Sequence, residues 1–225
     1  SGEEEPQAGC GPTMETATIV VSMCAEKGRA PEALRWLRYM QAAKGEPSDE
    51  LLTSVVDTCV AAGMVAEGAH ILRWMRDQGH DLNHSTVSTL IHSCTQAGRA
   101  DDAVGWLNIL RAEGKDVDTA TYSGVVNACA KMDRADEALA WLQVMRSEGK
   151  APTMVTYNTV INAFAQIGRA DEALVWLKTM RKEGMETDTI TYSSVINACA
   201  QAGRPDEAVY LLEAMLHEGK EANTI

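Results

Sequence analysis

The chain has 225 residues, with 20 Lys and Arg against 32 Asp and Glu, and a formal net charge of -12. This acidity favours solubility and argues against indiscriminate binding to nucleic acid or to an anionic membrane. No run of about 18 apolar residues occurs, so we expect no direct membrane insertion.

Residues 1–14 form an acidic leader that contains Gly and Pro. The leader lacks the apolar stretch of a signal peptide and does not resemble a transit peptide. Its composition predicts a linker ahead of the folded part.

From Glu15 the sequence repeats every 35 residues, in six units that begin near residues 15, 50, 85, 120, 155 and 190. The two clearest units are VTYNTVINAFAQIGRADEALVWLKTMRKEGMETDT and ITYSSVINACAQAGRPDEAVYLLEAMLHEGKEANT. A fixed period of this length predicts a stacked-repeat solenoid, in which each unit buries its apolar face against its neighbours. We expect one elongated domain over residues 15–225. Because Thr224 and Ile225 match the opening of the preceding unit, we also expect it to be part of a longer array.

Each unit carries two runs of apolar residues at three- and four-residue spacing, which predicts two amphipathic helices. Gly168, between the two runs of the fifth unit, suits a left-handed residue after the first helix, and Asp171 and Glu172 suit the positive end of the second. Asp133 replaces this glycine in the fourth unit. The predicted fold is all-α: an α-solenoid superhelix of about six helix-turn-helix repeats. The apolar residues of the fifth unit are Val160, Ile161, Phe164 and Ile167, then Ala173, Leu174, Leu177 and Met180.

Five of the six cysteines recur at one helical position, which Phe164 fills in the fifth unit. A position that accepts Cys or Phe is a packing position, because free Cys behaves as a small hydrophobe. No CxxC pair is present, so we predict no metal site and no cofactor. The five cysteines are Cys24, Cys59, Cys94, Cys129 and Cys199.

Four tryptophans share one register in the second helices, which predicts core positions between repeats. The histidines follow no metal or catalytic spacing, and most acidic residues recur at helix starts, where the helix dipole explains them. We therefore expect no catalytic residues and no enzyme activity. The tryptophans are Trp36, Trp106, Trp141 and Trp176.

The segment VTYNTVI from Val155, followed by Gly168-Arg169 and Glu172-Ala173-Leu174, resembles the pentatricopeptide repeat. The resemblance covers everything after the leader and is closest in the fourth to sixth units. The tetratricopeptide repeat is less similar, because its W-x-x-L-G-x-x-Y signature is absent and its period is 34 residues. The resemblance implies a helical-hairpin protein that binds RNA.

Proteins of this family read single-stranded RNA with one repeat per base, through two or three side chains. The resemblance assigns one polar residue near the start of the first helix and a second that closes the unit. By the family's preferences these pairs imply the site 5′-R-A-G-R-U-A-3′. The alternative is that the residues only cap helices, as Ser, Thr and Asn do without any ligand. The pairs are Thr18 with Ser48, Thr53 with Asn83, Ser88 with Asp118, Ser123 with Thr153, Asn158 with Asp188, and Ser193 with Asn223.

The resemblance also implies that an apolar residue three places before each leading polar residue packs against the bases. Val155 and Ile190 have this character, and Ala120 has it in part. An acidic group near phosphates is electrostatically unfavourable, so we expect the first three repeats to read RNA poorly. Their residues at this position are Glu15, Glu50 and Ser85.

Affinity for nucleic acid depends largely on Lys and Arg that neutralise phosphates. In the family a Lys often stands late in the first helix for this purpose, and here Lys131 is the one basic residue at that position. The other five units have Glu26, Ala61, Gln96, Gln166 and Gln201.

Two functions follow from the resemblance. One is a sequence-selective single-stranded RNA-binding factor in organelle RNA processing, stability or translation. The alternative is a structural scaffold that binds protein subunits of a large organellar complex, such as a ribosome or a membrane energy-converting complex. The acidity and the lost phosphate-binding lysines favour the scaffold, whereas the pairs of the last two units favour RNA. A location in a mitochondrion or chloroplast is implied by the resemblance alone.

Overall fold

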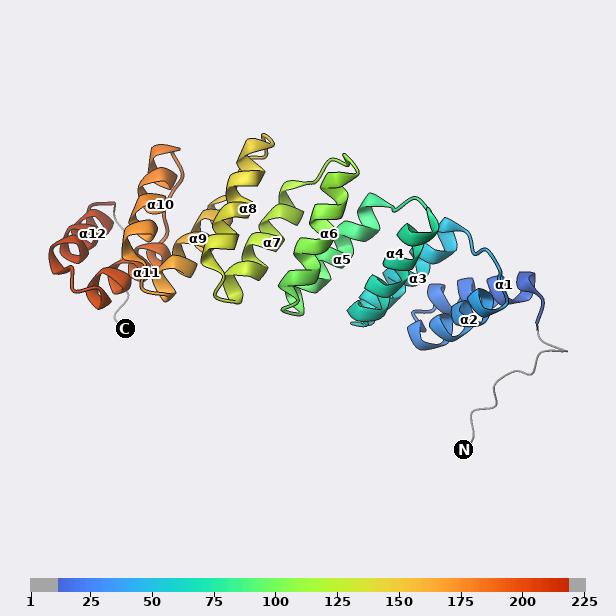
Figure 1. Ribbon diagram of the computed structural model, residues 1–225. Coiled ribbons are helices and arrows are strands. Elements are labelled where there is room, and N and C mark those ends of the chain that lie inside the picture. Colours follow the sequence, from blue (N-terminus) through green and yellow to red (C-terminus); the bar gives the residue numbers. More distant parts are fainter. Residues whose placement is uncertain (1–11, 219–225) are drawn as a thin grey trace, which may run out of the picture. The chain divides into compact units, whose positions relative to one another are not determined.

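The computed structural model describes residues 12–218, and within this range the chain forms twelve α-helices and no strand. The all-α prediction is confirmed, with two helices in each repeat (Figure 1). In this part of the chain, none of the helices combines the length and apolar character needed to cross a membrane. The helices are α1 (Met14–Glu26), α2 (Ala30–Ala42), α3 (Asp49–Ala61), α4 (Val65–Gln78), α5 (His84–Gln96), α6 (Ala100–Ala112), α7 (Thr119–Lys131), α8 (Ala135–Ser147), α9 (Met154–Gln166), α10 (Ala170–Lys182), α11 (Thr189–Gln201) and α12 (Pro205–His217).

The chain divides into two compact units that meet within α5. Unit 1 is Ser1–Ser93 and unit 2 is Cys94–Ile225. The expectation of a single domain over residues 15–225 stays a prediction.

Within each unit the helices form two layers. The first helices of successive repeats pack side by side, as α1 does with α3, and as α7 and α11 do with α9. Second helices pack on the first helix of their own repeat and on that of the next, as α8 does on α7 and α9 and as α10 does on α9 and α11. Among the described residues of either unit, no second helix packs directly on another second helix. The first-helix layer is therefore continuous, and the second helices are spaced apart.

The core of unit 2 repeats with the sequence. Tyr122, Tyr157 and Tyr192 occupy one register and are fully buried, as are Val160 and Phe164. The packing role predicted for the cysteines is confirmed, because four of the five are buried and Cys24 is half-buried. Burial raises the pKa of the Cys59 and Cys129 thiols to about 11. Trp106 and Trp141 are buried, and Trp36 and Trp176 are half-buried.

The turn that follows each first helix needs one residue with positive φ. Gly168 provides it in the fifth repeat, with φ of 75°, and Asp133 adopts φ of 58° in the fourth, as the sequence predicts. Left-handed backbone costs an L-residue about 1 to 2 kcal/mol because its Cβ approaches the following carbonyl oxygen. Asp133 therefore stores strain that the equivalent glycines do not.

Replacing the strained residue should stabilise the protein. We expect Asp133→Gly to raise the free energy of unfolding by about 0.5 to 1 kcal/mol, since glycine removes the steric cost and the larger entropy of the unfolded chain offsets part of the gain. Urea denaturation followed by circular dichroism measures this. Gly168→Asp is the matched control and should destabilise by a similar amount, because a Cβ there meets no atom within 4 Å and only the backbone is strained. A less stable Asp133→Gly variant would contradict the argument.

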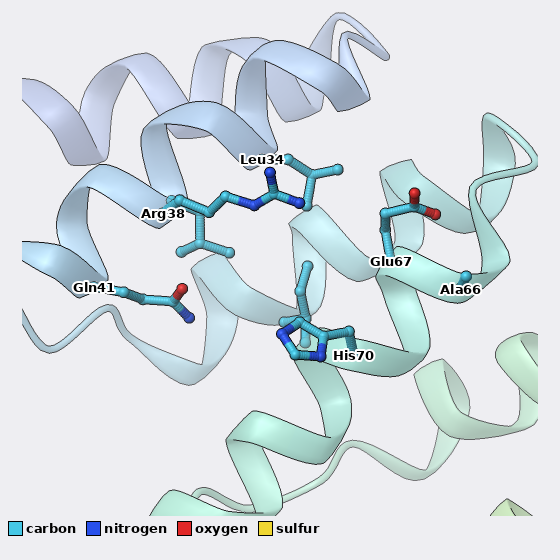
Figure 2. A pocket seen from close by; sticks show the side chains of 8 residues that line it. Leu34, Arg38, Gln41, Ala66, Glu67 and His70 are labelled. Carbon is cyan, nitrogen blue, oxygen red and sulfur yellow. The ribbon is translucent and has the colours of Figure 1, made fainter. Parts of the chain in front are cut away.

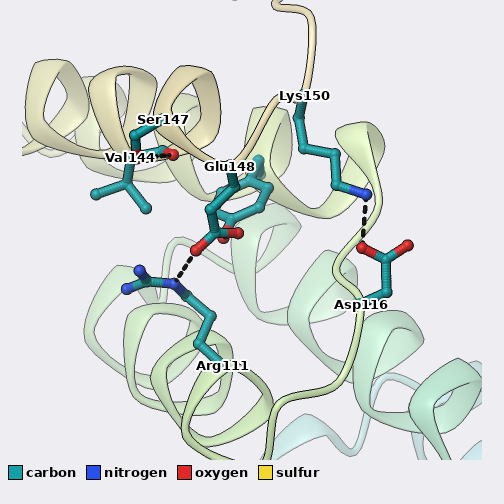
Figure 3. A network of polar contacts seen from close by, with 7 residues as sticks. Arg111, Asp116, Val144, Ser147, Glu148 and Lys150 are labelled. Atoms are coloured by element: carbon teal, nitrogen blue, oxygen red, sulfur yellow. Dashed lines mark hydrogen bonds and ion pairs between the residues drawn. The ribbon is translucent and has the colours of Figure 1, made fainter.

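A ladder of Tyr, Glu and Arg side chains crosses the repeats of unit 2, and Figure 3 shows the contact between Arg111 and Glu148 in its first rung. Arg111, from α6, donates its Nε hydrogen to Glu148 Oε1 at 2.7 Å, and the hydroxyl of Tyr122 donates to the other oxygen of the same carboxylate. The pattern returns one repeat later, where Arg146 and Tyr157 both donate to Glu183 at 2.6 Å. The third rung is Arg181 and Tyr192 on Glu218.

A second ladder links the starts of successive second helices in unit 2. Arg169 pairs with Asp136 of the preceding repeat at 2.6 Å and with Glu172 of its own. Arg134 and Arg204 make the equivalent pairs in the neighbouring repeats. Partly exposed ion pairs contribute about 0 to 1 kcal/mol each, so the ladders fix the register of neighbouring repeats more than they stabilise the fold.

Among the described residues of unit 1, neither ladder is found linking one repeat to the next, and the reason is visible in the sequence. The register of the three tyrosines holds Ala17, Leu52 and Val87, which have no hydroxyl, and Met64 stands where α4 would need an arginine. Unit 1 instead has a contact of 2.6 Å between His80 Nδ1 and Asp49 Oδ1.

The tyrosine ladder predicts a loss of stability at alkaline pH. Burial, and then the hydrogen bond to Glu183, raise the pKa of Tyr157 from 10.0 to about 12. The folded state therefore keeps this proton where the unfolded state has lost it. The contribution is complete below pH 10 and is lost as the pH rises from about 10 to about 12.

We expect the difference in unfolding free energy between the wild type and Tyr157→Phe to shrink across that pH range, because the variant has no phenol to titrate at this position. Urea unfolding at several pH values measures it. Tyr210→Phe removes an exposed hydroxyl from α12 and is the control. A difference for Tyr157→Phe that stays constant with pH would rule out the coupling.

Candidate nucleic-acid interface

The candidate interface is the exposed face of the first-helix layer. In α9, Val155, Asn158, Asn162 and Gln166 follow one another at spacings of three and four residues, so they share one face of the helix. Since α7 and α11 pack on either side of α9, the equivalent rows of these three helices run side by side in unit 2.

Four of the residues that close the described repeats are helix N-caps. Ser48 accepts a hydrogen bond from the amide of Leu51 at 3.3 Å, and Thr153 accepts one from Thr156 at 3.3 Å. Asp118 accepts the amide hydrogen of Thr121 at 2.7 Å. The capping role that the sequence left open is therefore real, and a readout role must be compatible with it.

Asn158 and Asp188 make direct contact. Asp188 Oδ1 accepts hydrogen bonds from the amide and the hydroxyl of Thr191, both at 2.7 Å, and thereby caps α11. Asp188 Oδ2 accepts from Asn158 Nδ2 at 2.9 Å. A carboxylate can only accept, so this contact fixes which end of the amide faces it. Asn158 Oδ1 is then buried without a hydrogen-bond partner, so one strong acceptor beside the cap is unsatisfied.

Ser123 and Thr153 are linked through a third residue. The Ser123 hydroxyl donates to the carbonyl of Thr119 at 2.8 Å and shares a hydrogen bond of 2.9 Å with the hydroxyl of Thr156. Thr156 is also 3.0 Å from the Thr153 hydroxyl. Both predicted readers of this repeat are therefore engaged in a local hydroxyl network.

The remaining predicted readers have less defined surroundings. Thr53 is half-buried, and in the described part of unit 1 no hydrogen bond joins it to Asn83, whose Oδ1 accepts from the amide of Ser85 at 2.9 Å. Ser88 Oγ is buried and has no partner. Ser88 belongs to unit 1, whereas Asp118 belongs to unit 2.

The first and last pairs complete the predicted set. The Thr18 hydroxyl donates to the carbonyl of Met14 at 2.9 Å, within its own helix. Ser193 is half-buried in α11, and its predicted partner, Asn223, lies outside the described residues.

The predicted base-packing residues are exposed apolar side chains. Val155 and Ile190 are each 65% exposed, on neighbouring helices and in the same row. Exposed β-branched side chains in a regular row have no packing role within the fold. The arrangement can cover the faces of flat ligands placed between successive repeats.

The predicted phosphate contact, Lys131, is the last residue of α7 and is exposed. Its equivalents Gln166 and Gln201 end α9 and α11 and are also exposed. Lys131 makes no ion pair with the described residues, so its ammonium group is available to an anion.

The exposed faces of the first helices differ in charge between the units. In unit 2, the face of α7, α9 and α11 carries small, apolar, hydroxyl and amide side chains with Lys131, and no carboxylate within the helices themselves. In unit 1 the equivalent face carries four carboxylates. They are Glu15, Glu26, Glu50 and Asp57.

One feature of this face was missed in the sequence. Asn127, Asn162 and Asn197 recur at a period of 35, each four residues after a predicted reader and hence one turn further along the same face. The Oδ1 of Asn162 is buried and has no partner. The exact 35-residue recurrence of asparagine was the signal that could have identified this row.

The spaced second helices leave grooves between them. In unit 1 a groove of about 290 Å³ separates α2 from α4, where Arg38, Gln41, Glu67 and His70 stand around an apolar floor (Figure 2). These polar groups extend from two helices over an open groove. They do not converge on one point as catalytic groups would.

Comparison with known proteins identifies the family. The sequence profile of the PPR repeat matches residues 15–44, 85–114 and 190–219, and that of the PPR repeat family matches residues 118–166 and 152–201. Together these matches span well over half of the chain, which therefore belongs to the pentatricopeptide repeat family. A search of curated protein sequences found no match.

Solved structures of pentatricopeptide repeat proteins share the fold. The protein PPR10 from maize aligns with a TM-score of 0.62 and 28% identity, over 96% of this chain and 31% of the maize chain, so this chain spans about a third of that protein. PPR10 in complex with an 18-nt psaJ RNA element aligns with a TM-score of 0.53 and 18% identity, over 96% and 36%. The PPR domain of Arabidopsis thaliana protein-only RNase P 1, in complex with tRNA, aligns with a TM-score of 0.67 and 16% identity, over 78% and 93%.

Proposed function

We propose that this chain binds single-stranded RNA through the first-helix face of unit 2, reads one base per repeat, and acts in RNA processing, stability or translation in an organelle. The observation that carries the proposal is the contact between Asn158 and Asp188, which holds a reading side chain in place and leaves it one acceptor. The organelle rests on family membership alone. We assign no catalytic residue.

The compared structures support the class of ligand. PPR10 was solved with an RNA element, and the PPR domain of the A. thaliana enzyme with tRNA. This chain has the same repeat and the same two-helix architecture. It brings its own polar and apolar residues to the continuous first-helix layer.

The fifth repeat is the strongest reader by its chemistry. Its unsatisfied group, Asn158 Oδ1, is an acceptor, and it lies next to the carboxylate of Asp188. Uracil presents an N–H donor at N3, which these acceptors can bind. Cytosine has a lone pair at N3, which the two protein acceptors would repel. The pair therefore favours uracil over cytosine. This agrees with U in the proposed site 5′-R-A-G-R-U-A-3′.

The base would lie between apolar side chains from two repeats. Val155 and Ile190 extend from α9 and α11 in the same row, each 65% exposed. Stacking of a base on an aromatic ring contributes about 1 to 3 kcal/mol, and these aliphatic side chains have no such ring. A few competent repeats in this chain therefore give modest affinity.

The uracil assignment predicts a selective loss. We expect an RNA with U at the fifth-repeat position to bind more tightly than the same RNA with C there, and Asn158→Ala to lose most of that preference. Loss of one hydrogen-bonded reader corresponds to about 1 to 3 kcal/mol, or roughly a 5- to 150-fold weaker Kd. Fluorescence anisotropy with labelled single-stranded RNAs measures both quantities.

The control for Asn158→Ala is Val175→Ala, at an exposed position of α10, in the other layer. A second variant, Asp188→Asn, retains an N-cap of equal quality and adds donors, so α11 should stay intact while discrimination against cytosine falls. If the wild type binds U and C RNAs equally, or neither at low salt, the readout proposal fails.

The phosphate row predicts a shallow salt dependence. For single strands, log K falls with log salt by about 0.7 per phosphate neutralised, and only Lys131 is in position to contribute here. We expect the double variant Gln166→Lys, Gln201→Lys to bind more tightly at low salt and to steepen the slope by about 1.4. Anisotropy titrations between low and physiological salt measure the slope.

A matched control places the same charges elsewhere. Val175→Lys with Tyr210→Lys adds two lysines at exposed positions of the second helices α10 and α12. It should leave the slope almost unchanged. If both double variants steepen the slope equally, the RNA does not follow the first-helix face.

A further inference from the structure

The two helix layers of unit 1 differ in charge. The second helices α2 and α4 contain four arginines and three carboxylates, whereas the first helices α1 and α3 contain five carboxylates and neither arginine nor lysine. In this unit the second-helix layer is therefore the one that attracts an acidic ligand. The four arginines are Arg35, Arg38, Arg73 and Arg76.

Two arginines of α2 are exposed without an ion pair. Arg35 and Arg38 lie one turn apart, and neither is within ion-pair distance of a carboxylate among the described residues. The carboxylate one turn before Arg35 belongs to Glu32, which is paired with Arg29. The Cζ of Arg35 lies 5.6 Å from the centroid of the Trp36 ring. Two cations on one side of α2 thus remain for a ligand.

The exposure of these two positions is a property of the repeat. In all six second helices both positions are exposed, so stacking of neighbouring repeats does not cover them. In unit 1 both positions carry basic side chains in both repeats. The equivalents of Arg35 are His70, Gly105, Ala140, Val175 and Tyr210, and those of Arg38 are Arg73, Asn108, Gln143, Lys178 and Glu213.

The groove between α2 and α4 lies beside these arginines. Arg38 and Gln41 extend from α2 on one wall, and Glu67 and His70 extend from α4 on the other (Figure 2). The volume of about 290 Å³ is at the lower limit of pockets that bury small molecules, which is about 300 Å³. Its size therefore suits the side chains of a docked segment. The floor is aliphatic and consists of Leu34, Leu37 and Ile71.

We propose that this groove is a docking site for an acidic, amphipathic segment of another protein. An apolar side chain of the segment would enter the groove above the aliphatic floor. Its Asp or Glu side chains would pair with Arg35 and Arg38, because a guanidinium binds a carboxylate through two parallel hydrogen bonds. Glu67 on the opposite wall would repel those carboxylates, which fixes the orientation of the segment.

The lining of the groove favours a protein segment over RNA. The aliphatic floor offers no ring on which a base could stack, and Glu67 would oppose phosphates along the α4 wall. A second copy of the chain would bring its own net charge of -12, and like charges oppose such a dimer. At physiological ionic strength the Debye length is about 8 Å. A short segment in the groove would therefore sense the nearby arginines more strongly than the carboxylates of the first-helix layer.

Fluorescence anisotropy of the full chain with three labelled peptides tests the proposal: an amphipathic helix of Leu and Glu, the same helix with Lys in place of Glu, and a peptide of Glu, Gly and Ser with equal negative charge. We expect the Leu and Glu peptide to bind and the other two to bind at least tenfold more weakly. Arg35→Gln with Arg38→Gln should weaken binding about tenfold and remove much of its salt dependence. Ala66→Trp, at an exposed position that lines the groove, should also weaken binding because the indole fills the space.

Each variant has a matched control in unit 2. Lys178→Gln with Lys182→Gln removes two positive charges from exposed positions of α10, and Ala140→Trp adds an indole at an exposed position of α8. Both controls should leave peptide binding unchanged, and circular dichroism should show the same helix content in all variants.

The proposal is overturned if the Leu and Lys peptide binds as well, if the α2 variant binds as the wild type does, or if ultracentrifugation shows a dimer that this variant abolishes. Displacement of the peptide by saturating single-stranded RNA would assign the groove to nucleic acid and would also overturn it. The groove lies in unit 1, whereas the proposed RNA site lies in unit 2. Failure of RNA binding leaves the peptide result intact, so the two proposals fail separately.

Discussion

Packing of first helix against first helix is the constraint from which the rest of the structure follows. A single hairpin cannot cover residues such as Tyr157 and Val160, which are fully buried only because neighbouring repeats enclose them. Burial on the sides of α9 leaves one face of that helix open. The exposed row that begins with Val155 is that face, and it returns every 35 residues because the core does. A regularly spaced ligand surface is thus a geometric consequence of the packing.

In the proposed function, capping and base reading would use different atoms of the same residue. Asp188 has two carboxylate oxygens, so one can cap α11 while the other orients Asn158. Thr153 has a single hydroxyl oxygen, which is engaged with Thr156. A closing carboxylate can therefore combine both roles, whereas a closing hydroxyl is largely committed to the helix. This difference separates the fifth repeat from the fourth more sharply than their similar sequences suggest.

The sequence was sufficient for the helices, the left-handed turn at Asp133 and the packed cysteines, because each depends on local spacing or on the period. The family resemblance predicted the pair of Asn158 and Asp188. It could not predict their hydrogen bonds, because sequence spacing does not say which carboxylate oxygen of Asp188 caps α11. The ladders were missed because they join residues such as Arg111 and Glu148, which are 37 positions apart and meet only when repeats stack. The division at α5 was likewise not visible in a regular period.

The ladders also determine how unit 2 can bind a polyanion. All seven arginines of this unit lie among the described residues, and each is within ion-pair distance of a carboxylate, as Arg169 is of Asp136. Arginines that are paired with carboxylates are less accessible to phosphates. Among the described residues of unit 2, Lys131 is then the basic residue left on the first-helix face. Binding by the proposed mechanism would then rest on bases instead of on the backbone. Since backbone contacts supply non-specific affinity, such a surface would give up strength but would keep a high ratio of specific to non-specific binding.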